Sequence, residues 1–244
     1  MPQIAVVTPY YKEPDDILLQ CHDSVLRQTI PCTHILVADG YPRPIFNNAP
    51  DLLHITLPRA NADVGNTPRA LGGIAAESYG FDAVTYLDAD NWYEPEHLAN
   101  LWQAHQQSGH PLVTCKRRFY DPNGIPMPIV EFAEDANTHV DTSCWLIARP
   151  AFSMLRAWLM PKPLSPVGDR IFFQKALHER FAIDMTNHRT VAFRTRYADH
   201  FRAANMPVPD DAKGNDTFDL PASYLRTPDG IVETIRALGF YPLL

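Results

Sequence analysis

The chain has 244 residues, 45% of them hydrophobic and 11% aromatic, which is enough for a sizeable core in one large domain or two small ones. Its 21 basic and 28 acidic residues give a formal net charge of −7, which predicts no general attraction to nucleic acid or to an anionic membrane. No run approaches the roughly 20 apolar residues of a membrane span, and the N-terminus enters a strand-like segment without the basic n-region of a signal peptide. We therefore expect a soluble, cytoplasmic protein with no integral membrane segment.

Strand-like and helix-like segments alternate in the first half of the sequence. Apolar runs predict strands at 3–7, 35–38, 52–57 and 83–87. Helical spacing of apolar residues predicts one helix that opens at Asp15 and another over about 68–79. This alternation is typical of a mostly parallel sheet with helices on both faces.

The second half is less regular. Helices are expected over about 95–107, 150–159, 169–180 and 228–238, and strands at 111–115 and 190–193, whereas 144–148 is an apolar run. The basic triplet 116–118 could grip an anionic substrate, but a solvated strand edge is the favoured interpretation. Residues 203–218 read as irregular, which indicates a lid or a disordered segment. The four cysteines lack CxxC or zinc-like spacing, so we expect reduced, mostly buried thiols.

Asp88 and Asp90 directly follow the strand predicted at 83–87. Side chains alternate along an extended chain, so the two carboxylates project to the same side and Ala89 faces away. Ligands of open α/β sheets bind beyond the carboxyl ends of the strands, where two hard oxygen ligands suit a divalent cation that holds a phosphate-bearing substrate. The alternative is that both residues cap the following turn.

Other polar residues fall at the same predicted edge of the sheet. Thr8, Tyr10 and Asp39 lie at or just past strand ends. Neither GxGxxG nor GxxxxGK[ST] is present, so a metal ion and side chains would have to hold the phosphates.

Four motifs in order resemble the family 2 glycosyltransferases, which have the GT-A fold. The first motif combines Thr8-Pro9-Tyr10, after the first strand, with Asp39-Gly40, at the end of the second strand. The other three are the turn Gly65-Asn66-Thr67-Pro68-Arg69, the DxD motif Leu87-Asp88-Ala89-Asp90, and Gly168-Asp169-Arg170. The resemblance covers about residues 3–180 and implies a Rossmann-like, mostly parallel sheet with a smaller acceptor-side subregion towards the C-terminus. It divides the chain into a nucleotide-sugar half (1–110), an acceptor and catalytic half (111–200), and a lid loop with a C-terminal helix (201–244).

The resemblance also implies roles in donor binding. Thr8, Pro9 and Tyr10 would line the nucleoside pocket, Asp39 would accept a hydrogen bond from the base, and Arg69 would lie near the base or phosphates. A carboxylate suits the N3–H donor of uracil, so UDP is favoured; guanine offers donors as well, so GDP is the alternative.

Metal binding and catalysis are assigned from the same resemblance. Asp90, supported by Asp88, would hold Mn²⁺ or Mg²⁺ against the diphosphate. His200, chosen over His188, would add a ligand. Asp169 would deprotonate the acceptor hydroxyl, and a single displacement of this kind inverts the anomeric centre.

Two departures from the family pattern are Ala38 and Gly168, which stand where many relatives carry acidic residues. The second weakens the assignment of Asp169, and Glu134, Asp135 and Asp141 are alternative bases. A sugar-nucleotide pyrophosphorylase and a catalytically inactive nucleotide-sugar-binding protein are the competing functions; the acceptor is unidentified.

Overall fold

The computed structural model describes all residues except 48, 50, 130–138, 215–217 and 244. A single eight-stranded sheet runs through it in the order β3-β2-β1-β4-β7-β6-β8-β5. The strands are β1 (Ile4–Tyr10), β2 (Cys32–Ala38), β3 (Leu52–Thr56), β4 (Ala83–Tyr86), β5 (Trp92–Tyr93), β6 (Leu112–Tyr120), β7 (Trp145–Ala148) and β8 (Ile183–Arg194).

The first four strands are mutually parallel, as the alternating pattern predicted. β7 pairs antiparallel with both β4 and β6. β6 and β8 are parallel, and β5, the last strand of the sheet, is antiparallel to β8. The carboxyl ends of β1, β2 and β4 therefore meet at one edge, and this geometry places the polar residues that follow them in a common region.

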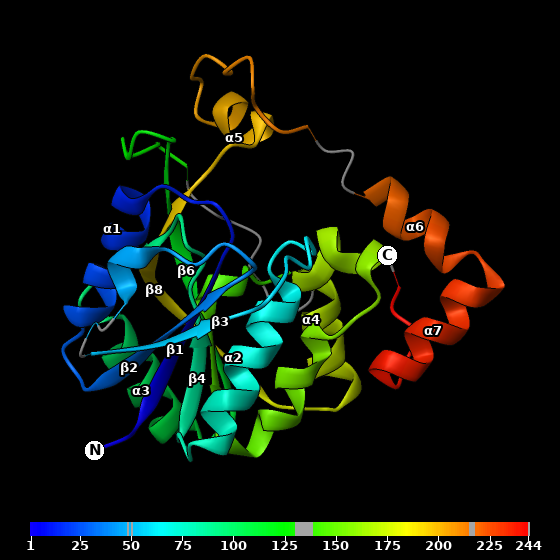
Figure 1. Ribbon diagram of the computed structural model, residues 1–244, viewed down its shortest axis with the longest axis horizontal. Coiled ribbons are helices and arrows are strands. Elements are labelled where there is room, and N and C mark those ends of the chain that lie inside the picture. The colour runs from blue at the N-terminus through cyan, green and yellow to red at the C-terminus, as the bar shows by residue number, and fades with distance from the viewer. Residues whose placement is uncertain (48, 50, 130–138, 215–217, 244) are drawn as a thin grey trace.

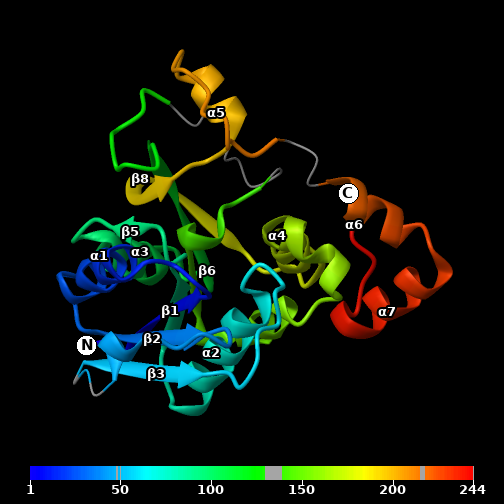
Figure 2. The ribbon, with the colours of Figure 1, turned by 45° about the horizontal axis from the view of Figure 1, so that its top comes forward.

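Helices cover both faces of the sheet (Figures 1 and 2). The helices are α1 (Asp15–Leu26), α2 (Asn66–Ser78), α3 (His97–Ser108), α4 (Gly168–His178), α5 (Ala198–Ala203), α6 (Asp219–Leu225) and α7 (Pro228–Leu238). α1 packs on β2 and β5 and α3 on β6 and β8, whereas α2 packs on β1, β2 and β4 from the other face, beside η3 (Arg149–Trp158) and α4.

The close approach of α2 to the sheet depends on a glycine. A Cβ atom built on Gly72 would come within 2.4 Å of Cγ1 of Val7, which is closer than two carbon atoms can pack. Val7, Ala70 and Tyr86 are fully buried there, in the large core cluster between the sheet and α2. The glycine thus allows the helix to lie against β1.

Three expectations about secondary structure need correction. The segment 150–159 is a 3₁₀ helix, η3, rather than an α-helix. β6 continues to Tyr120, and at the basic triplet 116–118 it pairs with β8 but not with β7; Arg117 is buried there and Arg118 is exposed, so the solvated-edge interpretation is wrong for Arg117. β1 runs to Tyr10, three residues beyond its predicted end.

In the C-terminal part, the structure agrees more closely with the expectations from the sequence. Thr227 caps α7 by accepting the backbone N–H of Gly230, and Gly239 ends the helix with a φ of 77°. Within 203–218, the described residues 204–214 form no helix, but Lys213 bridges to Tyr197. Helices α6 and α7 form a hairpin beside α4 (Figure 1). No helix among the described residues combines the length and apolar character needed to cross a membrane.

Candidate active site

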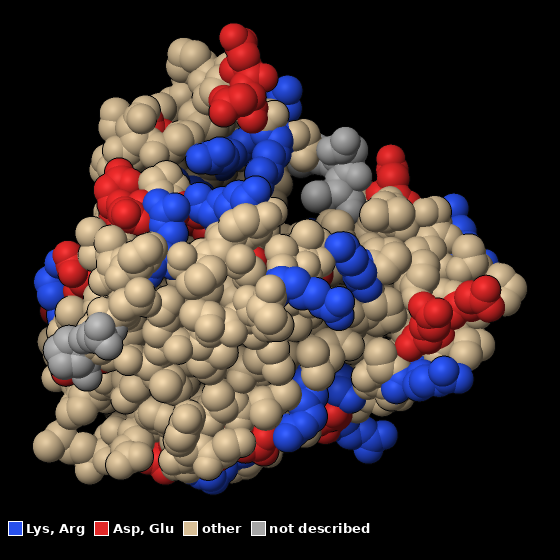
Figure 3. Space-filling model, in the orientation of Figure 1, with Lys and Arg blue, Asp and Glu red and all other residues tan. Residues whose placement is uncertain are grey.

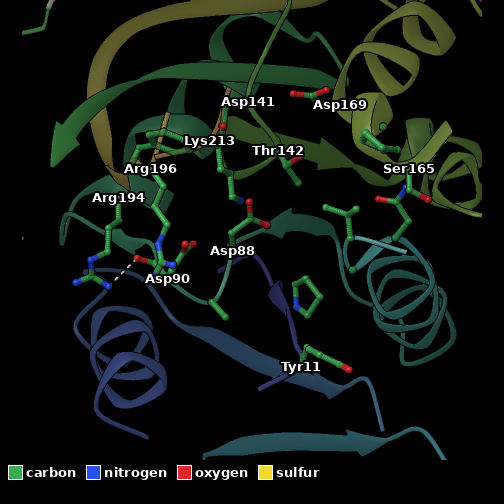
Figure 4. A pocket seen from close by; sticks show the side chains of 18 of the residues that line it. Tyr11, Asp88, Asp90, Asp141, Thr142, Ser165, Asp169, Arg194, Arg196 and Lys213 are labelled. Atoms are coloured by element: carbon green, nitrogen blue, oxygen red, sulfur yellow. Dashed lines mark hydrogen bonds between the residues drawn. The ribbon is translucent and has the colours of Figure 1, made fainter. Parts of the chain in front are cut away.

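A cleft of about 960 Å³ lies at the sheet edge where β1, β2 and β4 end. The predicted residues among its lining are Pro9, Tyr10, Asp39, Arg69, Asp88, Asp90, Asp141, Asp169 and His200. Figure 4 shows Asp88 and Asp90 just after the end of β4, with Arg194 beside Asp90 and with Arg196 and Lys213 on the opposite wall. The cleft therefore brings together acidic residues of the N-terminal half and basic residues of the C-terminal half.

Asp88 is held by the arginine that was predicted to approach the donor. Nη2 of Arg69 lies 2.5 Å from Oδ1 of Asp88, and Nη1 donates to the carbonyl of Val64 and to Oδ1 of Asn66. The Arg69 guanidinium also lies over the ring of Trp158, at 5.2 Å. Because Arg69 is only 7% exposed, this network fixes Asp88 in place.

Asp90 has a different environment. Its backbone carbonyl accepts from Nη1 of Arg194 at 3.0 Å, but among the described residues no cation lies within ion-pair distance of its carboxylate. Burial, together with the negative charges of Asp88 and Glu13, raises the pKa of Asp90 to about 6. Two carboxylates with one cationic partner leave uncompensated negative charge at this edge, and a divalent cation is the partner that would relieve it.

The predicted histidine ligand lies in the same cleft without joining the two aspartates. His200 contacts the rings of Phe119, Phe193 and Tyr197, and its Nδ1 is 2.6 Å from Oγ1 of Thr195. Burial, with help from the Arg117 charge, lowers the pKa of His200 to about 4 and keeps the ring neutral, which is the form that binds metals.

The three predicted ligands are nevertheless not assembled. Across the described ranges, no three His, Cys, Asp or Glu side chains gather closely enough to hold a metal ion, so the set Asp88, Asp90 and His200 is not preformed. His188 is exposed and does not line the cleft.

The prediction that Thr8 lines the nucleoside pocket is wrong. Thr8 is fully buried, and its Oγ1 lies 2.9 Å from Nε2 of His34 and 3.8 Å from Sγ of Cys21. Because β1 continues through Tyr10, alternation turns Thr8 and Tyr10 towards α1. Tyr10 reaches the wall of the cleft, but its hydroxyl bonds to Nε2 of His54 and to the N–H of Arg43.

Pro9 and Tyr11, which alternate with Thr8 and Tyr10 along the chain, line the cleft. Tyr11 was not among the predicted residues. It is 36% exposed, packs edge to face on Tyr41, and has Nζ of Lys12 within 5.0 Å of its ring centre. An exposed aromatic ring at the end of β1 offers a surface on which a nucleobase could stack.

Asp39 binds the chain that leads into α2. Its Oδ1 accepts from both the backbone N–H and the side-chain amide of Asn61, and its Oδ2 accepts the N–H of Ala62. It is 3% exposed yet still borders the cleft. An ionised carboxylate has about four acceptor positions, so the three bonds leave room for about one more donor.

Asp169 is the second residue of α4 and has a partner that the motifs did not reveal. Nε2 of His139 lies 2.5 Å from Oδ2 of Asp169, and the N–H of Arg170 donates to Oδ1. Burial alone would raise the pKa of Asp169, but the hydrogen bond from His139, the charge of that ring when it is protonated, and the hydrogen bond and charge of Arg170 outweigh it, so the pKa lies below its ordinary value. Asp169 is therefore an ionised carboxylate near neutral pH.

The alternative bases are less suitable or lie outside the described residues. Glu134 and Asp135 belong to the segment that the structure does not describe. Asp141 caps η2 (Thr142–Cys144) by accepting the N–H of Ser143, and it pairs with Nη1 of Arg117 at 2.9 Å. Its hydrogen bonds give Asp141 a structural role.

Basic residues of the C-terminal half are the main part of the site that the sequence did not predict. Arg117 is 8% exposed, lies over the rings of Phe119 and Phe193, and borders the cleft. In Figure 3, Lys and Arg side chains gather below α5. The segment Arg194-Thr195-Arg196 offered a signal, because its two arginines follow a predicted strand end as Asp39 does.

Backbone hydrogen bonds connect this segment to a distant lysine. The N–H of Lys213 donates to the carbonyl of Arg196, and the N–H of Ala198 donates to the carbonyl of Lys213. Figure 4 shows the side chains of Arg196 and Lys213 directed towards the two aspartates of β4. Cationic side chains thus face Asp88 and Asp90 across the cleft.

Comparisons with known proteins point to the same class. No family model matches the chain. Over 112 residues, or 43% of the chain, it is 34% identical to the succinoglycan biosynthesis protein ExoW of Rhizobium meliloti (strain 1021), and it spans about a third (34%) of that protein's length. Solved structures of S. aureus TarS 1-349 in complex with UDP and with UDP-GlcNAc align with 82% and 83% of the chain, at TM-scores of 0.60 and 0.61 and 16% identity.

The alignments cover 62% and 61% of those TarS chains, so this protein corresponds to less than two thirds of either. At 16% identity the structural match concerns the fold, and that fold is the GT-A type predicted from the motifs. The chain therefore has the GT-A fold, and the comparisons confirm its resemblance to the family 2 glycosyltransferases.

Proposed function

We propose that this protein is a glycosyltransferase that moves a sugar from a nucleotide-diphosphate donor, with UDP favoured, to an acceptor hydroxyl. The observation that carries the proposal is the pair Asp88 and Asp90 at the end of β4, in a cleft that Pro9, Tyr11 and Asp39 border on the nucleotide side. Two further observations support it: TarS was solved with UDP and with UDP-GlcNAc, and the partial relative ExoW is named for succinoglycan biosynthesis.

The residues present fit a divalent cation. The Asp90 carboxylate is the proposed direct ligand, since Asp88 is already engaged by Arg69. His200 is a neutral nitrogen ligand in the same cleft and would have to move towards the aspartates to contribute. When bound, Mn²⁺ or Mg²⁺ would neutralise the charge that grows on the diphosphate leaving group.

Basic side chains of the opposite wall provide further compensation for the donor. A nucleoside diphosphate brings several negative charges into a cleft that already contains Asp88 and Asp90. Arg196 and Lys213 face this position in Figure 4. Their charges would favour a bound diphosphate and would stabilise the negative charge that grows on it as the bond to the sugar breaks.

Asp169, together with the histidine bonded to it, supplies the base on the acceptor side. It is ionised and borders the cleft, and a positioned base of this kind accelerates proton transfer about 10² to 10⁴-fold. Attack by the acceptor oxygen on the side of the sugar opposite the diphosphate inverts the anomeric centre. We propose this stereochemical course for the enzyme.

Calorimetry with UDP in the presence and absence of Mn²⁺ tests donor binding. We expect binding with Mn²⁺ and weak or no binding without it, and we expect Asp90→Ala to remove the dependence on the metal. Binding that is equal with and without Mn²⁺, and unaffected by Asp90→Ala, would contradict the metal role.

Turnover requires a separate experiment. Thermal stabilisation by a panel of UDP- and GDP-sugars with Mn²⁺ identifies the donor, because a ligand that binds only the folded protein raises its melting temperature. Hydrolysis of that donor is then compared between wild type and Asp169→Asn. Equal and negligible release of nucleotide from both would indicate a nucleotide-sugar-binding protein instead of an enzyme.

A further inference from the structure

His139 and Asp169 meet in the cleft although 30 residues separate them in the sequence. His139 lies just before η2, and Asp169 lies in the first turn of α4. Both side chains are partly accessible, at 23% and 29%, and both border the cleft that contains Asp88 and Asp90. The pair is therefore within the candidate active site and open to a substrate.

The hydrogen bond between them determines where the protons are. An ionised carboxylate can only accept, so at 2.5 Å the proton between Oδ2 of Asp169 and Nε2 of His139 belongs to the imidazole nitrogen. Oδ1 of Asp169 already accepts the N–H of Arg170. In the neutral imidazole the remaining nitrogen, Nδ1, then carries the lone pair, and within the described part of the chain no hydrogen bond involves it.

Basicity distinguishes the two members of the pair. Two N–H groups donate to the Asp169 carboxylate and stabilise its ionised form, so this carboxylate is a weak proton acceptor. An imidazole backed by a carboxylate accepts a proton more readily, because the carboxylate stabilises the imidazolium that forms. Efficient general bases have a pKa near the operating pH, a condition that imidazole meets better than a stabilised carboxylate does.

We infer that Nδ1 of His139 is the atom that takes the proton from the acceptor hydroxyl, with Asp169 holding the ring from behind. The inference rests on the proposed glycosyltransferase function and adds a catalytic residue to it. The acceptor O–H bond breaks and its proton moves to Nδ1, while the acceptor oxygen bonds to the anomeric carbon. The bond between that carbon and the diphosphate oxygen breaks, its electron pair leaves with the nucleoside diphosphate, and Nε2–H stays bonded to Asp169.

Hydrolysis of UDP-GlcNAc, with water as the acceptor, provides a test that needs no knowledge of the natural acceptor; the donor found in the thermal panel replaces it if another stabilises the protein more. The key variant is His139→Gln, whose side-chain amide can still donate to Asp169 but has no basic nitrogen. We expect it to lower the rate of UDP release about 10² to 10⁴-fold. Its melting temperature and its affinity for UDP with Mn²⁺ should stay at the wild-type values.

The pH profile separates a base from a merely structural residue. In the wild type, release at saturating donor and Mn²⁺ should fall at acidic pH, because a protonated Nδ1 has no lone pair with which to accept the hydroxyl proton. The residual activity of His139→Gln should lack this limb, whereas UDP affinity measured over the same pH range reports the separate titration of Asp90. Imidazole added to His139→Gly should restore part of the rate.

The outcomes distinguish the two proposals. If wild type releases UDP and His139→Gln does so equally fast with the same pH profile, the histidine is not the base and the glycosyltransferase proposal stands. If wild type neither binds nor hydrolyses any nucleotide sugar, the proposed function fails and the inference fails with it.

Discussion

Replacing Asp90 by Asn should make the metal-free protein more stable while removing its metal-dependent nucleotide binding. Burial and the nearby carboxylates raise the pKa of Asp90 from 3.8 to about 6, so the folded state opposes its ionisation. At about 1.36 kcal/mol per pKa unit, this difference corresponds to at most about 3 kcal/mol. Because part of the side chain remains exposed and is screened by solvent, we expect a gain of about 1 to 3 kcal/mol.

The sign of the pH dependence follows from linkage. Between pH 4 and 6 the unfolded chain has already released the Asp90 proton, whereas the folded wild type retains it. Wild type therefore loses stability relative to Asp90→Asn as the pH rises through this window, and the gap is complete above about pH 7. Below about pH 4 the two proteins should be equally stable at this site.

Urea unfolding of both proteins at several values between pH 4 and 8, without metal, measures this gap. Asp88→Asn is the matched control, because it removes the charged partner of the buried Arg69 and should lower stability by about 1 to 3 kcal/mol. Added Mn²⁺ and UDP should then stabilise wild type and leave Asp90→Asn unchanged. A gap that is absent, reversed or independent of pH would refute the assignment of Asp90 as an uncompensated buried carboxylate.

Three further substitutions test other parts of the structure. Gly72→Ala should destabilise the protein by about 1 to 3 kcal/mol, because the new methyl group would overlap Val7, and thermal unfolding measures the loss; an unchanged melting temperature would mean that α2 can move away from the sheet. Asp141→Ala should cost about 3 kcal/mol or more in urea unfolding, since it leaves the buried Arg117 without this carboxylate; a cost below 1 kcal/mol would show that other contacts of the arginine suffice. Thr227→Ala should cost about 1 kcal/mol by removing the N-cap of α7, and Thr227→Ser, which retains the hydroxyl, should restore it.

The predicted site shows how far local reasoning extends. Asp88 and Asp90 both border the cleft because a strand end is a local property, but they lie at a turn and not in an extended tail, and Ala89 borders the cleft as well as packing in the apolar cluster of Tyr10 and Leu18. The prediction for Thr8 was wrong because the apolar run at 4–7 does not show that pairing with β2 extends β1 to Tyr10. Strand length is set by the neighbouring strand and not by the segment itself.

Contacts between distant segments account for most of what was missed. Arg117 looked like one of three solvated basic residues, yet alternation along β6 directs Arg117 inwards to Asp141 while Arg118 stays exposed. His139 precedes η2 without any local motif, and only the packing of that segment against α4 shows its role.

Local patterns in the sequence were enough to predict the parallel sheet of the N-terminal half, the edge at which its polar residues gather, and the two aspartates that border the cleft. These follow from apolar periodicity and from the chain order of short motifs, both of which depend on near neighbours in the sequence. Which aspartate lacks a cationic partner and which histidine meets Asp169 became visible only in the folded chain. The reason is physical: the charge state and the hydrogen-bond partner of a side chain depend on groups brought close by folding, and for Asp90 and Asp169 most of those groups lie on other elements.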